Sequence, residues 1–392
     1  MLSTLLSAVV LGVDATVVQV EVDVSFGLPG FTVVGLPDPG VRESRDRVRT
    51  AIRNSGFEFP YQRITVNLAP ADVRKAGSSF DLPVALGVLA ATGVLVRRHV
   101  PDLIVLGELS LDGGIQPSRG VLPVALHARR AGIAGLLVPV GNRAEAHAVS
   151  GVRTQTASSL ADAVEAINTD RDDPPCADSI AGPSPVEISA WGDLSDVRGQ
   201  AVARRALEIA AAGGHNLMLV GPPGAGKTMM ARRLPGLLPP LTREEAIEST
   251  CVYSVAGLLP AGLGLLSTRP FRAPHHSISG AALIGGGIRP RPGELSLAHN
   301  GVLFLDEMPE FDRHALEVLR QPLEEGTIRI SRSSGSAEFP AQIVLVGAMN
   351  PCPCGHYGHP RRICKCSTGQ RERYAGRISG PLLDRMDLVV EV

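Results

Sequence analysis

The chain has 392 residues, a formal net charge of −1 and an apolar fraction of 44%. This length predicts two or three domains, and the composition excludes an intrinsically disordered chain or one that is basic throughout. A surface that binds nucleic acid must therefore be local, such as a loop or the lining of a pore.

Two apolar stretches bear on cellular location. Met1–Val13 is apolar, but the first basic residue is Arg42, so we expect no export signal and a cytoplasmic protein. Leu82–Val96 is uncharged until its end, yet it is short for a bilayer span and contains Pro83 and two glycines. We predict a buried helix there and no membrane partner.

Residues 1–168 are predicted to form one α+β or α/β domain, because strand and helix patterns alternate along them. The alternation of valine with polar residues over Val18–Val24 is typical of a half-buried strand. Further strands are expected at Arg63–Leu68 and Ile104–Leu111, and helices at Pro39–Ser55, Asp81–Thr92, 121–131 and 158–167.

Residues 169–190 are rich in proline, glycine and aspartate, which indicates an exposed linker. Residues 191–392 are predicted to form an α/β domain. Helices are expected at 199–212 and 227–234, and strands at 216–220, 302–305 and 343–347.

The segment Gly221-Pro222-Pro223-Gly224-Ala225-Gly226-Lys227-Thr228 matches the phosphate-binding P-loop pattern at every fixed position. A predicted strand precedes it and a predicted helix follows, which is the required context. Glycines let backbone N–H groups turn towards phosphate oxygens, and the helix N-terminus adds a favourable dipole. Lys227 is expected to reach the β- and γ-phosphates of ATP, and Thr228 to ligate Mg²⁺. The alternative is an ordinary glycine-rich turn.

Two later strands complete this pattern. The apolar run Val302–Leu305 ends in Asp306 and Glu307. Asp306 suits the Mg²⁺ shell, and Glu307 can polarise the attacking water. The strand at 343–347 leads to Asn350, whose amide can orient that water. Without the other two motifs, Asn350 would be interpreted as a turn residue before a proline.

These motifs, in this order, resemble the AAA+ ATPases. Three further segments look like the magnesium-chelatase-related branch, and above all its ComM/YifB-like group: Arg272–Ser277, Gly293–His299 and Gly380–Leu388. The resemblance covers nearly the whole chain. It implies a P-loop AAA+ domain and a homo-oligomeric ring, a hexamer, that acts as a helicase on single-stranded or branched DNA.

The resemblance also implies roles for residues outside the P-loop. Arg385 matches the arginine that is supplied to the ATP of a neighbouring subunit. A surface arginine paired with Asp384 or Asp387 is the alternative. Two insertions are expected to face a central pore, at 257–287 and 327–342. In the second, Arg329 and Arg332 lie on a predicted hairpin with its turn at 333–336, where they could contact DNA phosphates or be solvated.

Four of the six cysteines lie close together, which is typical of a metal site in a reducing compartment. Cys352, Cys354, Cys364 and Cys366 form two Cys-x-Cys pairs that could complete a tetrahedral Zn²⁺ site. His356 and His359 lie between the pairs and could replace one cysteine. Free thiols are the alternative. Because the cluster begins two residues after Asn350, we hypothesise that a bound metal braces the loop that positions the water.

Residues 1–168 resemble the Lon-protease-like fold of the S5 type. The segment Lys75–Asp81 lies where Lon has its catalytic serine, and Ser79 is nearest to that position. Leu122 stands at the position of the lysine base, without which peptide hydrolysis is not expected. This domain is therefore interpreted as a binding or assembly domain without the catalytic dyad.

The sequence ends at Val392, just after the segment with Arg385, so by comparison with the family a helical lid is expected to be missing. Nucleotide binding is predicted more firmly than turnover. A metal-chelatase motor subunit and a non-catalytic ATP-binding scaffold are the alternative functions.

Overall fold

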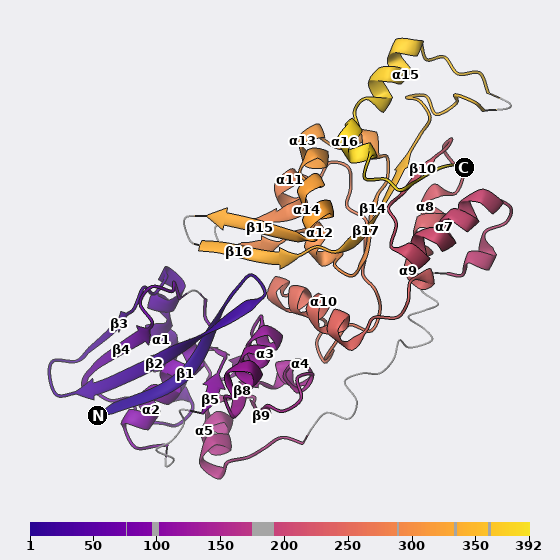
Figure 1. Ribbon diagram of the computed structural model, residues 1–392. Coiled ribbons are helices and arrows are strands. Elements are labelled where there is room, and N and C mark those ends of the chain that lie inside the picture. The colour runs from indigo at the N-terminus through magenta and orange to yellow at the C-terminus, as the bar shows by residue number, and fades with distance from the viewer. Residues whose placement is uncertain (76, 96–101, 175–191, 288–289, 333–334, 360–361) are drawn as a thin grey trace. The chain divides into compact units, whose positions relative to one another are not determined.

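The computed structural model describes residues 1–392 except 76, 96–101, 175–191, 288–289, 333–334 and 360–361 (Figure 1). Contacts divide the chain into two compact units. Unit 1 comprises Met1–Ile180 and Ser254–Leu265, and unit 2 comprises Ala181–Tyr253 and Leu266–Val392. Unit 1 thus includes a short segment that the sequence placed in the C-terminal domain. Most of the predicted linker lies outside the described residues.

Unit 1 is built on a seven-stranded mixed sheet with the order β3-β4-β2-β1-β5-β8-β9. The long antiparallel pair β1–β2 lies at its centre, and the other neighbours are parallel except β2–β4. The strands are β1 (Leu2–Leu11), β2 (Asp14–Ser25), β3 (Gly30–Val34), β4 (Arg63–Ala69), β5 (Leu103–Val105), β8 (Gly135–Pro139) and β9 (Arg153–Ala157).

The helices of unit 1 are α1 (Pro39–Asn54), α2 (Asp81–Ala91), α3 (Val121–Ala131), α4 (Arg143–His147) and α5 (Leu160–Thr169). Asp38 caps α1 by accepting a hydrogen bond from the Val41 N–H group. Almost every residue of α2 is buried, because it packs against β1, β2 and α1. The apolar stretch that begins at Leu82 is therefore a core helix, as predicted.

One expectation for unit 1 needs correction, and several strands were not predicted. The predicted strand Ile104–Leu111 is broken into β5 and a separate two-stranded pair, β6 (Glu108–Leu109) with β7 (Ile115–Gln116). The break falls at Gly107, whose N–H donates to the Ser79 carbonyl instead of to a sheet neighbour. The apolar amino terminus is the core strand β1, and β8 and β9 were not predicted.

Unit 2 is built on a five-stranded, all-parallel sheet with the order β11-β14-β17-β10-β18. Its strands are β11 (Phe271–Arg272), β14 (Gly301–Leu305), β17 (Ile343–Met349), β10 (Leu217–Val220) and β18 (Leu388–Glu391). The carboxyl ends of parallel strands meet at one edge, where ligands bind in open α/β sheets. The loops that follow β10, β14 and β17 therefore converge.

The helices of unit 2 are mostly short. They are α7 (Ala201–Gly213), α8 (Lys227–Ala231), α9 (Leu234–Leu237), α11 (Gly280–Ile284), α12 (Glu294–Leu297), α13 (Arg313–Glu317), α14 (Arg320–Glu325), α15 (Thr368–Ala375) and α16 (Gly380–Leu383). α10 (Arg243–Ala256) begins in unit 2 and ends in the segment assigned to unit 1. The predicted helix 227–234 is divided into α8 and α9, with Pro235 in the first turn of α9.

Two hairpins are inserted between strands of this sheet. β12 (Gly285–Gly286) pairs with β13 (Arg291–Pro292), and β15 (Thr327–Arg332) pairs with β16 (Gly335–Pro340). The second confirms the hairpin predicted at 327–342, although part of its turn lies outside the described residues. Among the described residues, no helix is long and apolar enough to cross a membrane.

Candidate functional site

The predicted P-loop runs from the end of β10 to the start of α8. Gly224 and Gly226 have φ values of +82° and +92°, a left-handed conformation that side chains disfavour. Gly226 is the residue before α8, so these two glycines turn the backbone into the helix N-terminus. This local geometry is the one that cradles phosphate groups.

Lys227 is the first residue of α8, and its side chain is buried against the loop. Its ammonium group donates to the carbonyl oxygens of Gly221 (2.7 Å) and Pro222 (3.0 Å) and to Asn350 Oδ1 (3.2 Å). Burial lowers the pKa of the Lys227 ammonium group, while Asp306 and Glu307 oppose that shift. Because all its acceptors are neutral, the ammonium keeps its capacity to pair with an anionic group that enters the site.

Asp306 follows β14 and receives two hydrogen bonds. The Thr228 hydroxyl donates to one carboxylate oxygen (2.6 Å), and the Glu307 N–H donates to the other (2.9 Å). Thr228 and Asp306 thus present adjacent oxygen ligands, the kind that Mg²⁺ prefers. Glu307 has a φ of +52°, which is uncommon for a residue with a side chain and is typical of constrained functional positions.

The residues predicted from three separate motifs surround one cavity of about 410 Å³. Its lining is Pro223, Gly224, Ala225, Gly226, Lys227, Thr228, Met229, Asp306, Glu307, Met349 and Asn350. Gly221 and Pro222 lie behind it as acceptors for Lys227. The structure therefore brings together the phosphate loop, the carboxylate pair and the amide.

His276 also approaches this site, although no role there was predicted for it. Its Nδ1 lies 3.9 Å from a carboxylate oxygen of Glu307, and its ring contacts His275 at a centroid distance of 4.1 Å. The signal was present in the histidine pair of the segment Arg272–Ser277. A contact across 31 positions could not be deduced from it.

Arg385 lies away from this cavity. Its backbone carbonyl accepts from the Asn216 side chain, directly before β10, and its guanidinium group pairs with Glu324. The P-loop leaves the opposite end of the four-residue strand β10, roughly 13 Å away at 3.3 Å per residue. Arg385 is thus distant from the P-loop of its own chain. It pairs with neither Asp384 nor Asp387, the partners proposed for a surface arginine.

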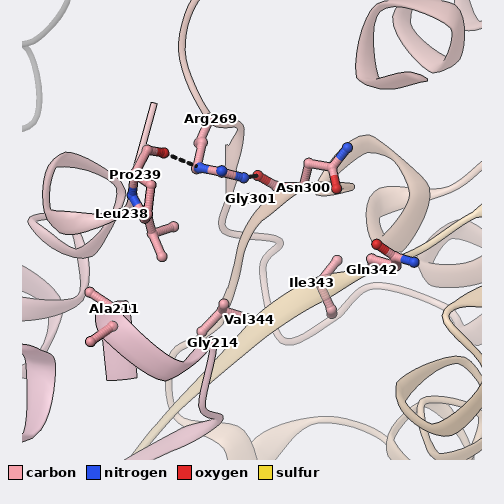
Figure 2. A pocket seen from close by; sticks show the side chains of 11 residues that line it. Ala211, Gly214, Leu238, Pro239, Arg269, Asn300, Gly301, Gln342, Ile343 and Val344 are labelled. Carbon is pink, nitrogen blue, oxygen red and sulfur yellow. Dashed lines mark hydrogen bonds between the residues drawn. The ribbon is translucent and has the colours of Figure 1, made fainter. Parts of the chain in front are cut away.

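A second cavity, of about 310 Å³, lies at the opposite edge of the sheet, where β14 and β17 begin (Figure 2). Arg269 donates there to the carbonyl oxygens of Pro239 (2.6 Å) and Asn300 (2.7 Å), and it forms an ion pair with Glu245 (3.0 Å). These partners engage the guanidinium group within the protein. None of the predicted site residues lines this cavity.

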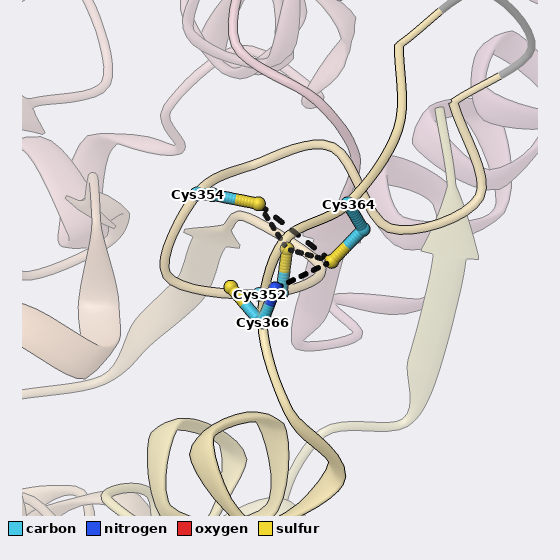
Figure 3. Close-up of side chains that lie close together, drawn as sticks. All are labelled: Cys352, Cys354, Cys364 and Cys366. Atoms are coloured by element: carbon cyan, nitrogen blue, oxygen red, sulfur yellow. Dashed lines mark hydrogen bonds between the residues drawn. The ribbon is translucent and has the colours of Figure 1, made fainter.

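The four clustered cysteines are brought together as predicted (Figure 3). Their sulfur atoms all lie within 4.8 Å of one another. The Cys352 sulfur is 3.4 Å from that of Cys354 and 3.7 Å from that of Cys364, which is 3.6 Å from Cys354. A tetrahedral zinc site with bonds of 2.3 Å requires sulfur separations of about 3.8 Å. The donor set and its spacing therefore suit Zn²⁺.

Backbone N–H groups surround these sulfur atoms. Tyr357 N–H donates to Cys352 (3.3 Å), and Cys366 N–H donates to Cys364 (3.4 Å). Hydrogen bonds from the backbone of His356 and Lys365 lower the pKa of the Cys354 thiol to about 6, whereas burial and the neighbouring thiols raise the pKa values of Cys364 and Cys366. Donors placed in this way stabilise thiolates, which are the form that binds metal.

The cysteine loop packs directly on the P-loop. A Cβ atom placed on Gly355 would lie 2.7 Å from Pro223 Cδ, so only glycine permits this approach. Tyr374 of α15 is buried, and its hydroxyl group is hydrogen-bonded to the backbone of Asn350. The cysteine loop and its flanking helix thus contact two parts of the nucleotide site.

The hairpin β15–β16 has a buried apolar face and an exposed polar face. Arg329, on the exposed face, donates to Glu338 directly across the hairpin (2.8 Å), and this pairing raises the pKa of the guanidinium group. The exposed pair is weak enough to exchange for another anion. The side chain of Arg332 lies outside the described residues.

In unit 1, the segment Lys75–Asp81 lies between β4 and α2. Ser78 donates its hydroxyl hydrogen to Glu108, and the Ser79 carbonyl accepts from Gly107 N–H (3.2 Å). Leu122, which the resemblance to Lon places at the position of the lysine base, is fully buried in α3, and its N–H donates to Glu145 (2.8 Å). An apolar side chain at this position cannot act as a base.

Known proteins are similar to this chain over most of its length. A family model described as magnesium chelatase, subunit ChlI, matches residues 193–392, and a related ChlI model matches residues 20–142. Competence protein ComM of Haemophilus influenzae is 50% identical over 97% of this chain and 74% of its own length. YifB of Salmonella typhimurium is 46% identical over the same shares. The chain belongs to the ComM/YifB family of magnesium-chelatase-related AAA+ proteins.

Membership of this family has two consequences for the predictions. It confirms the mixed α/β class with a P-loop AAA+ core, and it implies ATP and Mg²⁺ as ligands. The Lon protease of Chloroflexus aurantiacus is 33% identical over 33% of this chain and 16% of its own length. This local match agrees with the Lon-like fold predicted for the N-terminal part.

Proposed function

We propose that this ComM/YifB family member is an AAA+ motor that hydrolyses ATP and uses the energy to act on DNA as a helicase of the branch-migration type. The convergence of Lys227, Asp306, Glu307 and Asn350 on one cavity is the observation that carries the proposal. The cavity is bounded on one side by phosphate-binding backbone and on the other by carboxylates. That arrangement suits phosphoryl transfer to water.

Each residue has a defined task. The P-loop N–H groups and Lys227 hold the phosphates, and Lys227 exchanges neutral carbonyl acceptors for phosphate oxygens. Thr228 and Asp306 would hold Mg²⁺, which offsets the negative charge that develops during transfer. Glu307 accepts the proton of the attacking water, and Asn350, already held by Lys227, orients that water.

Arg385 is proposed to act on the ATP of a neighbouring subunit in a homo-hexameric ring. Its distance from its own P-loop supports that role, because an arginine supplied across an interface must lie away from its own site. Such an arginine raises the rate of phosphoryl transfer by roughly 10³-fold or more. Glu324 then holds the side chain until the neighbour is present.

The DNA contact is proposed to include the hairpin β15–β16, with Arg329 and Arg332 against phosphates in the central pore. The cysteine cluster is proposed to hold one Zn²⁺ per chain and to brace the loop after Asn350. Metal analysis after purification without chelator tests the second proposal. Stoichiometric zinc that is lost in Cys354→Ser and Cys366→Ser supports it, and substoichiometric zinc in the parent protein leaves free thiols. A cytoplasmic location agrees with cysteines kept reduced.

ATP hydrolysis measured with and without single-stranded DNA tests the function. We expect DNA to stimulate hydrolysis, and Glu307→Gln to retain ATP binding while losing at least about 100-fold in hydrolysis rate. Stimulation by a porphyrin but not by DNA would favour a chelatase motor subunit. ATP binding without turnover under either condition would favour a scaffold.

A further inference from the structure

The segment around the cysteine cluster differs in charge from the rest of the molecule. The whole chain has a net charge of −1, whereas residues 353–377 contain six basic residues and only one acidic residue, Glu372. A local excess of basic residues is typical of nucleic-acid-binding surfaces in proteins whose net charge is near zero.

Three of these basic side chains are exposed and lack an ion pair within the described part of the chain. Arg362 and Lys365 lie on either side of Cys364, and Arg373 lies on α15, where its guanidinium group donates to the Gly369 carbonyl. Four other arginines of unit 2 form ion pairs instead. Arg272, Arg329, Arg377 and Arg385 are paired with Glu294, Glu338, Glu310 and Glu324 respectively.

Exposed aromatic and apolar groups lie among these charges. The Tyr357 side chain is 52% exposed, and the Arg371 guanidinium group lies 4.1 Å from its ring centroid. Ile363 is 89% exposed. Proteins that bind single strands combine positive charges along the backbone path with planar groups on which bases stack. A protein partner with an acidic face would use the charges but would not require the planar group.

The cysteines determine where these groups lie. Cys352 and Cys354 lie at one end of the loop and Cys364 and Cys366 at the other, so the loop that carries Tyr357, Arg362 and Lys365 forms a knuckle closed at its base. The helix α15, with Arg371 and Arg373, follows directly after Cys366. The same loop contacts Pro223 through Gly355. A ligand on the knuckle is therefore one packing layer away from the phosphate loop, which gives the two sites a physical route for coupling.

We propose that Tyr357, Arg362, Lys365, Arg371 and Arg373 form a binding surface for single-stranded nucleic acid, the knuckle surface. Phosphates pair with the exposed cations, and a base stacks on the Tyr357–Arg371 pair. The inference rests on the proposed function and adds a contact separate from the hairpin β15–β16.

Binding of a fluorescently labelled polythymidine strand, measured at several salt concentrations, tests the knuckle surface. The triple variant Arg362→Gln, Lys365→Gln, Arg373→Gln should bind roughly 10- to 100-fold more weakly, with the slope of log affinity against log salt reduced by about 2. Tyr357→Leu should weaken binding about tenfold and leave the slope unchanged. Zinc content and ATP affinity measured without DNA show that each variant is folded.

A control variant removes the same charge elsewhere: Arg45→Gln, Arg198→Gln, Arg205→Gln, all at exposed positions. It should bind the strand like the parent protein. The knuckle surface would be overturned if the knuckle variant keeps the affinity and salt slope of the parent protein while the double variant Arg329→Ala, Arg332→Ala binds weakly. The proposed function would then remain intact. A loss of charge-dependent binding with no effect of Tyr357→Leu would overturn the stacking of a base on the Tyr357–Arg371 pair and reduce the surface to phosphate contacts. Absence of strand binding by the parent protein would reject both proposals.

Discussion

Two loops of this molecule carry a buried lysine, a hydroxyl group and a carboxylate, and the lysine of one of them lines a cavity. In the P-loop, Lys227 donates to backbone carbonyls beside a cavity of about 410 Å³, and Thr228 donates to Asp306. In the Lon-like unit, Lys75 is fully buried and donates to the Pro70 carbonyl, and Ser78 donates to Glu108.

The difference lies in what surrounds the ammonium group. Burial lowers the pKa of both lysines, so a shifted pKa does not distinguish them. Lys227 borders open space that is lined with phosphate-binding backbone, whereas Lys75 has no exposed surface at all. A buried lysine is therefore a binding group where a ligand can reach it, and otherwise a packing group. The same substitution at the two positions should separate these roles.

Lys227→Ala should abolish most of the affinity for ATP. The variant loses a charge-assisted hydrogen bond to phosphate, and its affinity should fall at least about 100-fold. Isothermal titration with a non-hydrolysable ATP analogue measures this loss. The free energy of unfolding should change less than in a fully buried lysine, because Lys227 lines a cavity and water can replace its ammonium group as the hydrogen-bond donor. Unchanged nucleotide affinity would remove the P-loop assignment.

Lys75→Ala should have the opposite profile. The substitution leaves a cavity and an unpaired Pro70 carbonyl, so the free energy of unfolding of the Lon-like unit should fall by about 3 kcal/mol. Urea denaturation followed by circular dichroism measures this change, and ATP affinity under native conditions should match the parent. A fall in ATP affinity without a loss of stability would contradict the packing role.

Asp81, at the start of α2, gives the same loop a pH dependence. Its carboxylate is fully buried, and burial raises its pKa to about 6, although Arg47 donates to it at 2.8 and 3.1 Å. In the unfolded chain the pKa is about 3.9. The folded state binds the proton more tightly, so this contribution to stability is present below about pH 4 and is lost as the pH rises through about 6.

The parent protein should therefore lose about 2 kcal/mol of unfolding free energy relative to Asp81→Asn between about pH 4 and 7. Urea unfolding of both proteins at several pH values gives this difference directly. If the difference instead grows in favour of the parent protein as the pH rises, pairing with Arg47 outweighs burial and the direction of the shift is wrong.

The nucleotide site was largely predictable from the sequence because its chemistry lies in contiguous motifs. The P-loop, the Asp306-Glu307 pair and Asn350 each follow a strand with a clear apolar run. Parallel strands then bring their carboxyl ends together without further information. The cysteine cluster was predictable for the same reason, because cysteines this close in sequence can come together in a small loop whatever the surrounding fold is.

Contacts between distant segments were not predictable. His276 reaches Glu307 from a region without a strong helical or strand pattern, and Tyr374 reaches Asn350 across the cysteine loop. β1 was not predicted, because an apolar run at the amino terminus can also belong to an export signal. Its pairing with β2 depends on contacts that the local sequence does not specify. Ser254–Leu265 joins unit 1 although it lies within the sequence of unit 2, and no local pattern indicates that.

The smallest expected effect concerns the contact between the cysteine loop and the P-loop. Gly355 and Gly358 both have a φ of +77°, so alanine at either position costs about 1 kcal/mol of backbone strain. At Gly355 the new Cβ would also lie 2.7 Å from Pro223 Cδ, whereas at Gly358 nothing lies within 4 Å. Gly355→Ala should therefore displace the P-loop and weaken ATP binding by roughly tenfold, about 1.4 kcal/mol. Gly358→Ala should lose similar stability and keep the parent affinity, which makes it the matched control. Titration of both variants with the ATP analogue decides the point: equal affinities would mean that the cysteine loop is only adjacent to the nucleotide site and does not support it.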